Sequence, residues 1–501
     1  MSGAQSRDWL SHRVDASPDA TALVAAGSGE TWTYADLDAA VDRTAGRLAA
    51  LGVDAGDHLG VVAPPRVSTV RLVFAAMRLG AVLVPLGPRL TAQELRRNAE
   101  TADVTTLVCT AATEAAALDA GDGTGVPVAS VDEADHAAVS SLSATEPAPF
   151  DAHEWSPSDR LALLFTSGTT GAPKAVDLRT GNFLASATAS AFRLGLRRDD
   201  RWLVTLSLHH TGGLVQVQRL ALYGTAVVLR ESFDPAGVVA DVERYDVTGV
   251  SLVPTMLARM LDAAEGTPAF ADTLRTVLLG GAPATDALVE RCRARDVPVF
   301  PTYGMTETAS QIATATPDEA FERPGTVGRP LYGTEVIVRD DASEELPRGE
   351  TGELVVSGPT VAAGYYGDPE ATAEAFSPDG LRTGDAGYRD DDGRVWVLNR
   401  LDDRVLTGGE NVDPGEVVAV LREHPAVDDA AVVGVPDETW GERVAALVVA
   451  DDVTADELRD HCRSSLAGYK VPRQVAFADS LPRTASGTVE RPAVRARLED
   501  G

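Results

Sequence analysis

The sequence predicts an α/β protein of two domains: a large N-terminal domain with doubly wound sheets, residues 1–400, and a small α+β C-terminal domain, residues 401–501. The first observation is that short apolar runs alternate with amphipathic helical stretches, which is typical of parallel sheets covered by helices. The second is a change to shorter strands and turns after Gly352. The third is length, because 501 residues exceed what one compact core usually holds.

Elements of the N-terminal domain follow from apolar spacing. A helix is predicted from Thr33, where TYAD has a capping-box pattern and apolar residues repeat on one face, at Leu37, Val41, Ala45 and Leu48. Four short runs predict strands: HLGVVAP, AVLVPLG, TTLVCT and LALLFTS. The stretches VSTVRLVFAAMRLG and TAQELRRNAETA between them predict helices. The clearest strand–helix–strand unit is LRTVLLGG, ATDALVERCRARD and VPVFPTYG.

Two regions depart from this alternation. Residues 113–151 are rich in Ala, Asp, Ser and Thr with weak periodicity, and we expect a solvated excursion there. The domain boundary is placed near Arg400-Leu401-Asp402, after the strand-like runs TGELVVSG and RVWVLNR. Beyond it, Asp413-Pro414 caps a predicted helix, GEVVAVLREH, which leads into DDAAVVGV and VAALVVA.

Composition restricts the class of protein. The chain is 44% hydrophobic and has no run of about eighteen uncharged apolar residues, so no membrane span is expected. The N-terminus lacks the form of a secretory signal, and we expect a cytoplasmic protein. The three cysteines, Cys109, Cys292 and Cys462, have no paired spacing, which fits a reducing compartment with neither a disulfide framework nor a zinc site.

The formal net charge of −31 argues against nucleic acid or an anionic membrane as a partner, because the field of the whole surface would repel both. Basic residues are nearly all arginine, and Lys174 and Lys470 are the only two lysines. Acidic residues are scattered in short clusters such as Asp390-Asp391-Asp392. We therefore hypothesise a protein that works at very high salt, where screening suppresses self-repulsion.

The segment FTSGTTGAPK, residues 165–174, has the composition of a phosphate-binding loop. Its glycines let backbone N–H groups turn inward, and its hydroxyls add further donors. It is not a Walker loop, because the spacing differs and the following AVDLR predicts a strand where a Walker loop would open a helix. A flexible Gly/Thr turn is the alternative, but so unusual a composition ending in a rare lysine favours phosphate binding.

FTSGTTGAPK resembles the phosphate loop of the adenylate-forming superfamily, which includes acyl-CoA synthetases, carrier-protein adenylation domains and luciferases. Four further segments match in the same order: YGMTET at 303–308, TGD at 383–385, NRLDDRVLTGGENV at 399–412 and YKVPR at 469–473. The resemblance covers nearly the whole chain. It implies the adenylate-forming enzyme fold with a hinge between its domains, and ATP, Mg²⁺ and CoA as the cofactors and co-substrates of acyl activation.

The resemblance implies an ATP site built from loops at strand ends. Its members are Thr166, Ser167, Gly168, Thr169, Thr170, Gly171, Gly281, Ala282, Tyr303, Gly304, Thr306, Asp385 and Arg400. The ring of Tyr303 can stack on a purine, and the carboxylate of Asp385 can accept both ribose hydroxyls. A buried core tyrosine and a backbone-capping aspartate are the alternatives.

Glu307, Lys174, His210 and position 488 are the catalytic candidates. Glu307 is a hard oxygen ligand suited to Mg²⁺ on the triphosphate, although an isolated loop glutamate is more often a solvated charge. Asp402 matches the hinge about which the small domain rotates between two half-reactions. Gly408 and Gly409 belong to the moving face, and with Lys470 they are candidates for CoA binding, although surface basic residues usually contribute little.

The superfamily usually carries a lysine at the position of Thr488, in LPRTASGTVERP. That lysine would offset the repulsion between the carboxylate and the α-phosphate. Three explanations stay open for its replacement. Arg483 or Arg491 supplies the charge, or adenylation is slowed while thioester formation is spared, or the chain is an engineered variant.

The acid is indicated by a narrower resemblance. LSLHHTGGLVQVQRLALYGTAVVL and PTYGMTETASQI resemble the o-succinylbenzoate–CoA ligases of menaquinone biosynthesis. The pattern places His210 between acid pocket and thiol channel, where a satisfied structural histidine is the alternative. Only the succinyl carboxylate of this acid is activated, so the aromatic one needs a partner. Arg219 is the candidate, with Ser310 and Gln311, and an intraprotein ion pair of Arg219 is the alternative.

Other functions stay open. A fatty, short-chain or aryl acid would need no buried cation in its pocket. A nucleotide- or CoA-binding protein that has lost adenylation is suggested by Thr488 alone. A carrier-protein adenylation domain is less favoured, since no carrier segment follows in this sequence. A homodimer is compatible with the sequence, which does not determine the oligomeric state.

Overall fold

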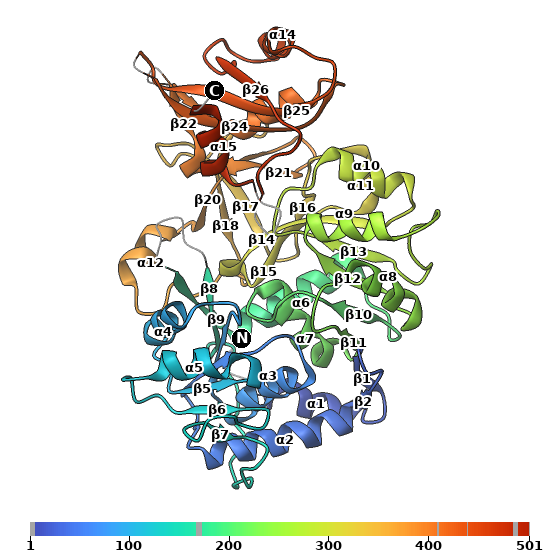
Figure 1. Cartoon of the computed structure of the whole chain (residues 1–501), viewed down its shortest axis with the longest axis vertical. Coiled ribbons are helices and arrows are strands. Elements are labelled where there is room, and N and C mark those ends of the chain that lie inside the picture. Colours follow the sequence, from blue (N-terminus) through green and yellow to red (C-terminus); the bar gives the residue numbers. More distant parts are fainter. Residues whose placement is uncertain (1–5, 167–172, 408–409, 438, 484–488, 500–501) are drawn as a thin grey trace.

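The computed structural model describes residues 6–166, 173–407, 410–437, 439–483 and 489–499. These residues form four sheets, of which the C-terminal one lies at one end of the molecule, in orange and red in Figure 1. Helices cover the first two sheets, so the predicted α/β class is confirmed for the large domain. Within the described ranges, every helix is too short or too polar to cross a membrane.

A nine-stranded sheet combines two strands from the first 33 residues with seven strands from residues 201–330. In spatial order it runs β16 (Arg329–Pro330), β15 (Ser310–Thr314), β14 (Val299–Met305), β13 (Thr276–Leu279), β12 (Gly249–Leu252), β10 (Arg201–Val204), β11 (Ala226–Leu229), β1 (Thr21–Ala25) and β2 (Thr31–Thr33). Neighbours are parallel from β14 to β1 and antiparallel at both edges. The predicted strand–helix–strand unit is confirmed as β13, α10 (Asp286–Ala294) and β14.

A seven-stranded sheet contains the four runs predicted as strands. Its order is β7 (Ser140–Ser141), β6 (Val128–Ser130), β5 (Thr106–Cys109), β3 (His58–Val62), β4 (Val82–Leu86), β8 (Arg160–Thr166) and β9 (Lys174–Arg179). All neighbours are parallel except β8 and β9. Because β9 begins at Lys174, the candidate phosphate loop joins two paired strands, as the sequence predicts.

The helices follow the predicted periodicity. Those of the large domain are α1 (Trp9–Ala16), α2 (Tyr34–Ala50), α3 (Val67–Leu79), α4 (Ala92–Thr101), α5 (Glu114–Gly121), α6 (Thr180–Leu194), α7 (Thr211–Tyr223), α8 (Pro235–Arg244), α9 (Pro254–Ala263), α10, α11 (Pro317–Glu322) and α12 (Pro369–Ala375). The capping box at the start of α2 is confirmed, since Thr33 and Asp36 bond each other's backbone N–H groups. Burial of the predicted apolar face of α2 is also confirmed.

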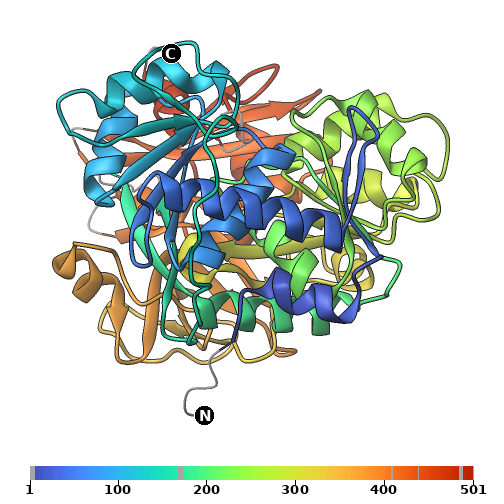
Figure 2. The same cartoon turned by 90° about the horizontal axis from the view of Figure 1, so that it is seen from below.

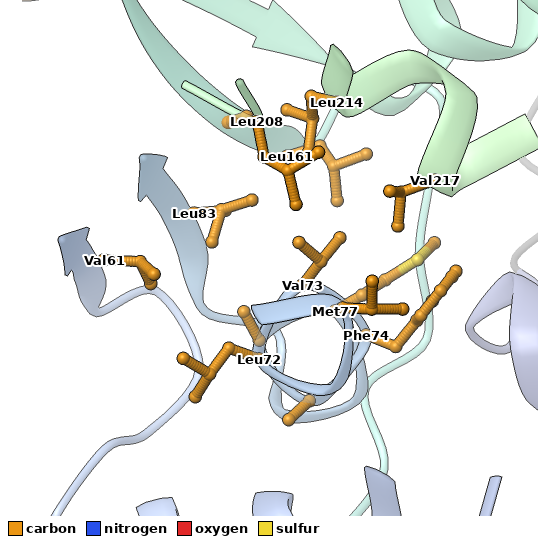
Figure 3. Packing of buried hydrophobic residues seen from close by; sticks show 14 of the residues in the cluster. Val61, Leu72, Val73, Phe74, Met77, Leu83, Leu161, Leu208, Leu214 and Val217 are labelled. Atoms are coloured by element: carbon orange, nitrogen blue, oxygen red, sulfur yellow. The ribbon is translucent and has the colours of Figure 1, made fainter. Parts of the chain in front are cut away.

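One hydrophobic cluster joins the two large sheets. In Figure 2 the blue helices of residues 34–79 lie between the cyan and the green parts of the domain. Figure 3 shows Val73 and Met77 of α3 pointing toward Leu83 and Leu161 of the seven-stranded sheet and toward Val217 of α7. The buried apolar area of this cluster fixes α7, and therefore the groups at its two ends, against both sheets.

The prediction that residues 113–151 form a solvated excursion is wrong in part. The segment begins at the end of the short 3₁₀ turn η1 (Ala111–Thr113) and contains helix α5 and strands β6 and β7. Val128 and Ala129 are buried. The run VPVAS is too short to show a period of its own. Its backbone groups are satisfied by extending the exposed edge of β5, which is a tertiary effect that the local pattern does not carry.

The remaining strands form two mixed or antiparallel sheets. The third sheet, antiparallel, contains β17 (Glu335–Arg339), β18 (Gly352–Ser357), β20 (Gly380–Arg389), β19 (Phe376–Ser377) and β21 (Val395–Arg400). The fourth contains β23 (Glu410–Val412), β22 (Val405–Thr407), β25 (Gly441–Ala450), β24 (Val427–Asp437) and β26 (Gln474–Phe477), with α13 (Pro414–Arg422), α14 (Ala455–Ser465) and α15 (Arg491–Glu499). Strand partners change between Arg400 and Val405, the interval in which the predicted boundary lies.

Candidate active site

The ends of the candidate phosphate loop are held together. Thr166, the last residue of β8, pairs with Lys174, the first residue of β9. The loop residues Ser167, Gly168, Thr169, Thr170 and Gly171 lie outside the described residues. The Nζ atom of Lys174 lies 4.9 Å from the ring centroid of Tyr365, a residue that the sequence analysis did not single out.

Strand β14 delivers the YGMTET motif to the same region. The 3₁₀ turn η2 (Thr306–Thr308) follows it, and β15 then folds back antiparallel. Only a glycine fits at Gly304, because a Cβ there would lie 1.8 Å from the carbonyl oxygen of Ser310. Gly281 and Ala282 follow β13 at the same edge of the sheet. Carboxyl ends of neighbouring parallel strands therefore converge here, as in other open α/β sheets.

Three predicted nucleotide residues contact one another directly. The Tyr303 hydroxyl donates to Asp385 Oδ2 at 2.5 Å, and Arg400 Nη1 donates to Asp385 Oδ1 at 2.9 Å. Strands β20 and β21 pair Asp385 with Arg400, which sets this geometry in the backbone. Burial raises the pKa of Asp385 although Arg400 opposes the rise. Tyr303 is half-buried and packs against the hydrophobic cluster that contains Ile312 and Val336.

Glu307 fits a cation-binding role. Its side chain is only 5% exposed, and no arginine, lysine or histidine of the described residues forms an ion pair with it. The Tyr365 hydroxyl donates to its Oε1 at 2.9 Å. Burial raises the pKa of Glu307, although the hydrogen bond from Tyr365 and the charge of Arg400 oppose the rise. A buried carboxylate in this state is the kind of ligand that Mg²⁺ prefers.

Two neighbouring histidines lie at the start of α7. His210 is the residue that precedes the helix, and its ring centroid is 4.1 Å from that of His209. Burial lowers the pKa of both imidazoles, that of His209 to about 3, with Arg89 acting in the same direction. His210 was predicted as a site residue and His209 was not. Nδ1 of His209 is buried and has no hydrogen-bond partner among the described residues.

Arg219 is a buried cation at the other end of α7. Its side chain is 4% exposed, and no described carboxylate forms an ion pair with it. Its Nη2 donates to Ser186 Oγ at 3.1 Å, while its Nε is buried without a partner. Burial lowers the pKa of the Arg219 guanidinium. The intraprotein ion pair held open as an alternative therefore has no partner among the described residues.

A small cavity of about 30 Å³ adjoins Arg219, with Gln216 and Tyr223 also in its wall. The turn between η2 and β15 is connected to Arg219 through Ser186, whose hydroxyl donates to Ala309 O at 2.9 Å. Ser310 follows Ala309 and is half-buried. Gln311 is directed elsewhere, since its amide donates to Thr314 Oγ1 at 2.8 Å along β15.

The C-terminal candidates are only partly described. Asp402 lies in the 3₁₀ turn η3 (Leu401–Asp403), between the third and fourth sheets. Lys470 Nζ forms an ion pair with Glu416 at 2.6 Å. Gly408, Gly409 and Thr488 lie outside the described residues.

Both arginines considered as replacements for the missing lysine have acidic partners. Arg483 pairs with Asp429 at 2.5 Å, and Arg491 pairs with Asp403 at 2.8 Å. Asp403 follows the hinge candidate directly, so the charge of Arg491 is engaged beside the hinge in this structure.

Known proteins match the chain along its length. The family model for AMP-binding enzyme matches residues 10–366, and that for AMP-binding enzyme C-terminal domain matches residues 416–488. A 2-succinylbenzoate–CoA ligase of Geobacillus kaustophilus is 40% identical over 482 residues, 96% of this chain and 95% of the relative. One of Bacillus pumilus is 38% identical over 486 residues, 97% of this chain and 96% of the relative.

Solved structures agree on the fold. An o-succinylbenzoate CoA synthetase from Bacillus subtilis, in complex with the acyl-adenylate intermediate OSB-AMP, is 36% identical with a TM-score of 0.86, covering 100% of this chain and 99% of that one. ATP-bound MatB from Rhodopseudomonas palustris is 30% identical with a TM-score of 0.88, covering 98% and 99%. These matches confirm the predicted fold of a large α/β domain with a small C-terminal domain. The chain therefore belongs to the AMP-binding enzyme family.

Proposed function

We propose that this chain is an ATP-dependent acid–CoA ligase that converts o-succinylbenzoate to o-succinylbenzoyl-CoA in menaquinone biosynthesis. Relatives that carry the name of this ligase cover nearly the whole chain at 36–40% identity. The reaction has two steps, because a carboxylate is a poor acyl donor and must first be converted to an acyl adenylate.

The observation that carries the proposal is the unpaired Arg219. It lies on α7, the helix that His210 precedes. We assign to it the aromatic carboxylate of the acid, while the succinyl carboxylate reacts near His210. Only an acid that carries a second anionic group would compensate the buried guanidinium, which is costly to leave alone.

In the first step, an oxygen of the succinyl carboxylate attacks the α-phosphorus of ATP and pyrophosphate leaves. We assign the binding of phosphate oxygens to Lys174, to the hydroxyl of Thr166, which pairs with Lys174, and to Thr306, which precedes Glu307 in η2. Tyr303, Asp385 and Arg400 hold the nucleoside. Glu307 would hold Mg²⁺, which when bound neutralises charge on the triphosphate.

In the second step, the thiol of CoA attacks the acyl carbon and AMP leaves. His210 stays neutral at physiological pH because burial lowers its pKa, so it can bond a neutral or developing oxyanion group without adding a charge. The small domain would turn about Asp402 between the steps and present Gly408, Gly409 and Lys470 to CoA.

The test is release of pyrophosphate from ATP with o-succinylbenzoate in molar KCl, with and without CoA. We expect release coupled to thioester formation with this acid, and little with benzoate or succinate alone, since neither combines a succinyl chain with an aromatic carboxylate. Turnover on a mono-acid of similar length, with none on o-succinylbenzoate, would keep the two-step mechanism and reject the substrate.

A second candidate function rests on Thr488: a homologue that binds nucleotide and CoA but adenylates poorly. Thr488→Lys distinguishes the two. We expect it to increase the adenylation rate at least about tenfold and to change thioester formation from preformed acyl adenylate little, since the missing cation would act on the charge of the first step. Equal changes in both steps would contradict this partition.

We also propose that the enzyme works in the cytoplasm of a cell with a high internal salt concentration. The net charge of −31 and the near-absence of lysine support this proposal. Activity that is highest in dilute buffer and falls steadily with KCl would contradict it.

A further inference from the structure

Tyr365 lies between the two oppositely charged groups of the candidate phosphate and metal site. Its hydroxyl donates to Glu307 Oε1 at 2.9 Å, and the face of its ring lies 4.9 Å from Lys174 Nζ. Both contacts come from one side chain, and both charged partners come from other parts of the chain. Lys174 forms no ion pair with any carboxylate of the described residues, and its ammonium lies over the ring of Tyr365.

The backbone fixes Tyr365 in this position. Val176 of β9 forms a bridge with Tyr365, and Tyr366 N donates to Ala175 O at 2.7 Å. On the other side Thr372 Oγ1 accepts from Tyr365 N at 2.9 Å, which ties the residue to α12. The ring also packs edge-on against Phe376 at 5.6 Å. A side chain held from two sides in this way is preorganised before any ligand binds.

Without the ring, the ammonium of Lys174 and the carboxylate of Glu307 would attract each other, and strongly so in a site with little water. A direct ion pair would occupy both charged groups. The Lys174 ammonium would then be less available to bind phosphate, and the Glu307 carboxylate less available to bind a metal ion. In the structure Lys174 and Glu307 form no ion pair with each other, and each contacts Tyr365 instead. The Tyr365 hydroxyl donates to Oε1 of Glu307 and not to Oε2.

We infer that Tyr365 is a positioning residue that keeps Lys174 and Glu307 apart and holds the Glu307 carboxylate in place for a nucleotide-bound divalent cation. The inference rests on the proposed function for the roles of these two residues, but not on the identity of the acid. The Tyr365 hydroxyl then acts on Glu307, which would bind the metal ion, and the ring acts on Lys174, which would bind phosphate.

Two variants separate the two parts of the side chain. Tyr365→Phe removes the hydroxyl and keeps the ring, so we expect the Mg²⁺ concentration for half-maximal ATP binding to rise about tenfold, the usual effect of losing a partner of a metal ligand. Binding of ATP in the presence of EDTA should stay within about twofold of the parent, because Lys174 keeps its contact. Tyr365→Leu should weaken ATP binding in EDTA as well.

Tyr366→Phe is the matched control. Its hydroxyl donates to Asp103 Oδ2 at 2.7 Å and touches neither Glu307 nor Lys174, so its loss should leave the Mg²⁺ dependence unchanged. The measurement is isothermal titration of each purified full-length protein with ATP at a series of Mg²⁺ concentrations and in EDTA, without acid or CoA. Circular dichroism establishes folding, and Tyr365→Phe alone decides if Tyr365→Leu does not fold.

A Mg²⁺ dependence of Tyr365→Phe within twofold of that of Tyr366→Phe would overturn the inference, and so would equal losses with Mg²⁺ and with EDTA. If the parent binds ATP with Mg²⁺ yet activates no acid, the proposed function fails while this inference is still decided by binding. If the parent shows no Mg²⁺-dependent ATP binding, both are overturned.

Discussion

Arg219 carries its charge in the protein interior, where burying an unpaired charge costs free energy of folding. A buried cation without an acidic partner lowers the stability of the folded protein, and its retention is explained by a ligand that supplies the anion. Arg275 lines the same cavity, but it pairs with Asp200 at 2.5 Å and so needs no ligand. The two arginines therefore differ in what their removal should do.

Arg219→Met should raise the KM for o-succinylbenzoate about 100-fold, leave the KM for ATP within about twofold, and raise or leave unchanged the free energy of unfolding, since an unpaired buried charge is removed. Arg275→Met should instead lower the free energy of unfolding by about 3 kcal/mol, because it strands Asp200, and should leave the acid KM nearly unchanged. Steady-state kinetics and urea unfolding provide both readouts. An Arg219→Met effect confined to the KM for ATP would contradict the assignment.

His209 makes the folded protein sensitive to acid. Burial lowers its pKa to about 3, whereas an imidazole in the unfolded chain titrates near 6.5. The unfolded state therefore binds more protons between about pH 6.5 and pH 3, and stability falls as the pH drops through this window, by at most about 1.4 kcal/mol per pH unit. His209→Phe should flatten this fall.

The measurement is the free energy of unfolding in urea at several pH values from 7 to 4, at constant high KCl. His12→Gln is a control at an exposed histidine and should keep the parent slope. The same slope in His209→Phe and the parent would show that this imidazole does not titrate between the folded and unfolded states.

Residues of the site were predictable where a functional side chain lies within a sequence motif that resembles those of a known family. Tyr303, Asp385 and Arg400 were placed together by motif and are in contact. Tyr365 was not predictable, because it lies outside the five matched motifs and carries no charge, and its contact with Glu307 is set by the fold. Gln311 followed the motif, yet its amide bonds Thr314, since side-chain direction depends on the strand register.

The turn between β14 and β15 is the element that sets the site's geometry. Ala309 and Ser310 both have positive φ angles, 51° and 128°, which non-glycine residues adopt only where surrounding contacts enforce it. The close approach of Gly304 to Ser310 is one such contact. Backbone strain is thus stored directly after η2, two and three residues beyond Glu307.

Gly304→Ala should displace this turn, because its Cβ cannot occupy space 1.8 Å from a backbone oxygen. We expect a loss of about 1–3 kcal/mol in the free energy of unfolding and at least a tenfold fall in kcat. Gly27→Ala is the control, since nothing lies within 4 Å of a Cβ there. Thermal unfolding and pyrophosphate release measure the two effects, and an unchanged kcat in Gly304→Ala would contradict the role of the turn.

Elements were predictable where a run is long or strongly periodic. The capping box and apolar face of α2 and the strand–helix–strand unit of β13, α10 and β14 carry their own signal. Strands β6 and β7 do not, because they are short and exist through pairing with β5 and with each other. The antiparallel order of the third sheet likewise follows from long-range pairing and not from local sequence.

Arginine supplies the cation in the ion pairs of the described residues, apart from one pair of His153 and one of Lys470. The arginine guanidinium can donate two hydrogen bonds to one carboxylate. These bonds hold the pair in a defined geometry even when salt screens the attraction between the charges. The excess of acidic side chains then repels across the surface of the whole molecule at low salt, where the screening length is about 10 Å at 0.1 M and about 3 Å at 1 M.

The melting temperature should therefore rise by about 5–10 °C between 0.1 M and 2 M KCl, because screening removes self-repulsion from the folded state. Differential scanning calorimetry over a KCl series gives the result. Sucrose at matched osmolality is the control, since it does not screen charge and should not reproduce the part of the rise below 1 M. A melting temperature that falls with KCl would reject adaptation to salt.

The scarcity of lysine has a practical consequence. An amine-reactive reagent can modify only the N-terminus, Lys174 and Lys470. The first of these lysines stands over Tyr365 at the phosphate side of the site, and the second is paired with Glu416 on the small domain. Mass spectrometry of two peptides would thus follow nucleotide occupancy and small-domain exposure in the same sample, each serving as the internal reference of the other.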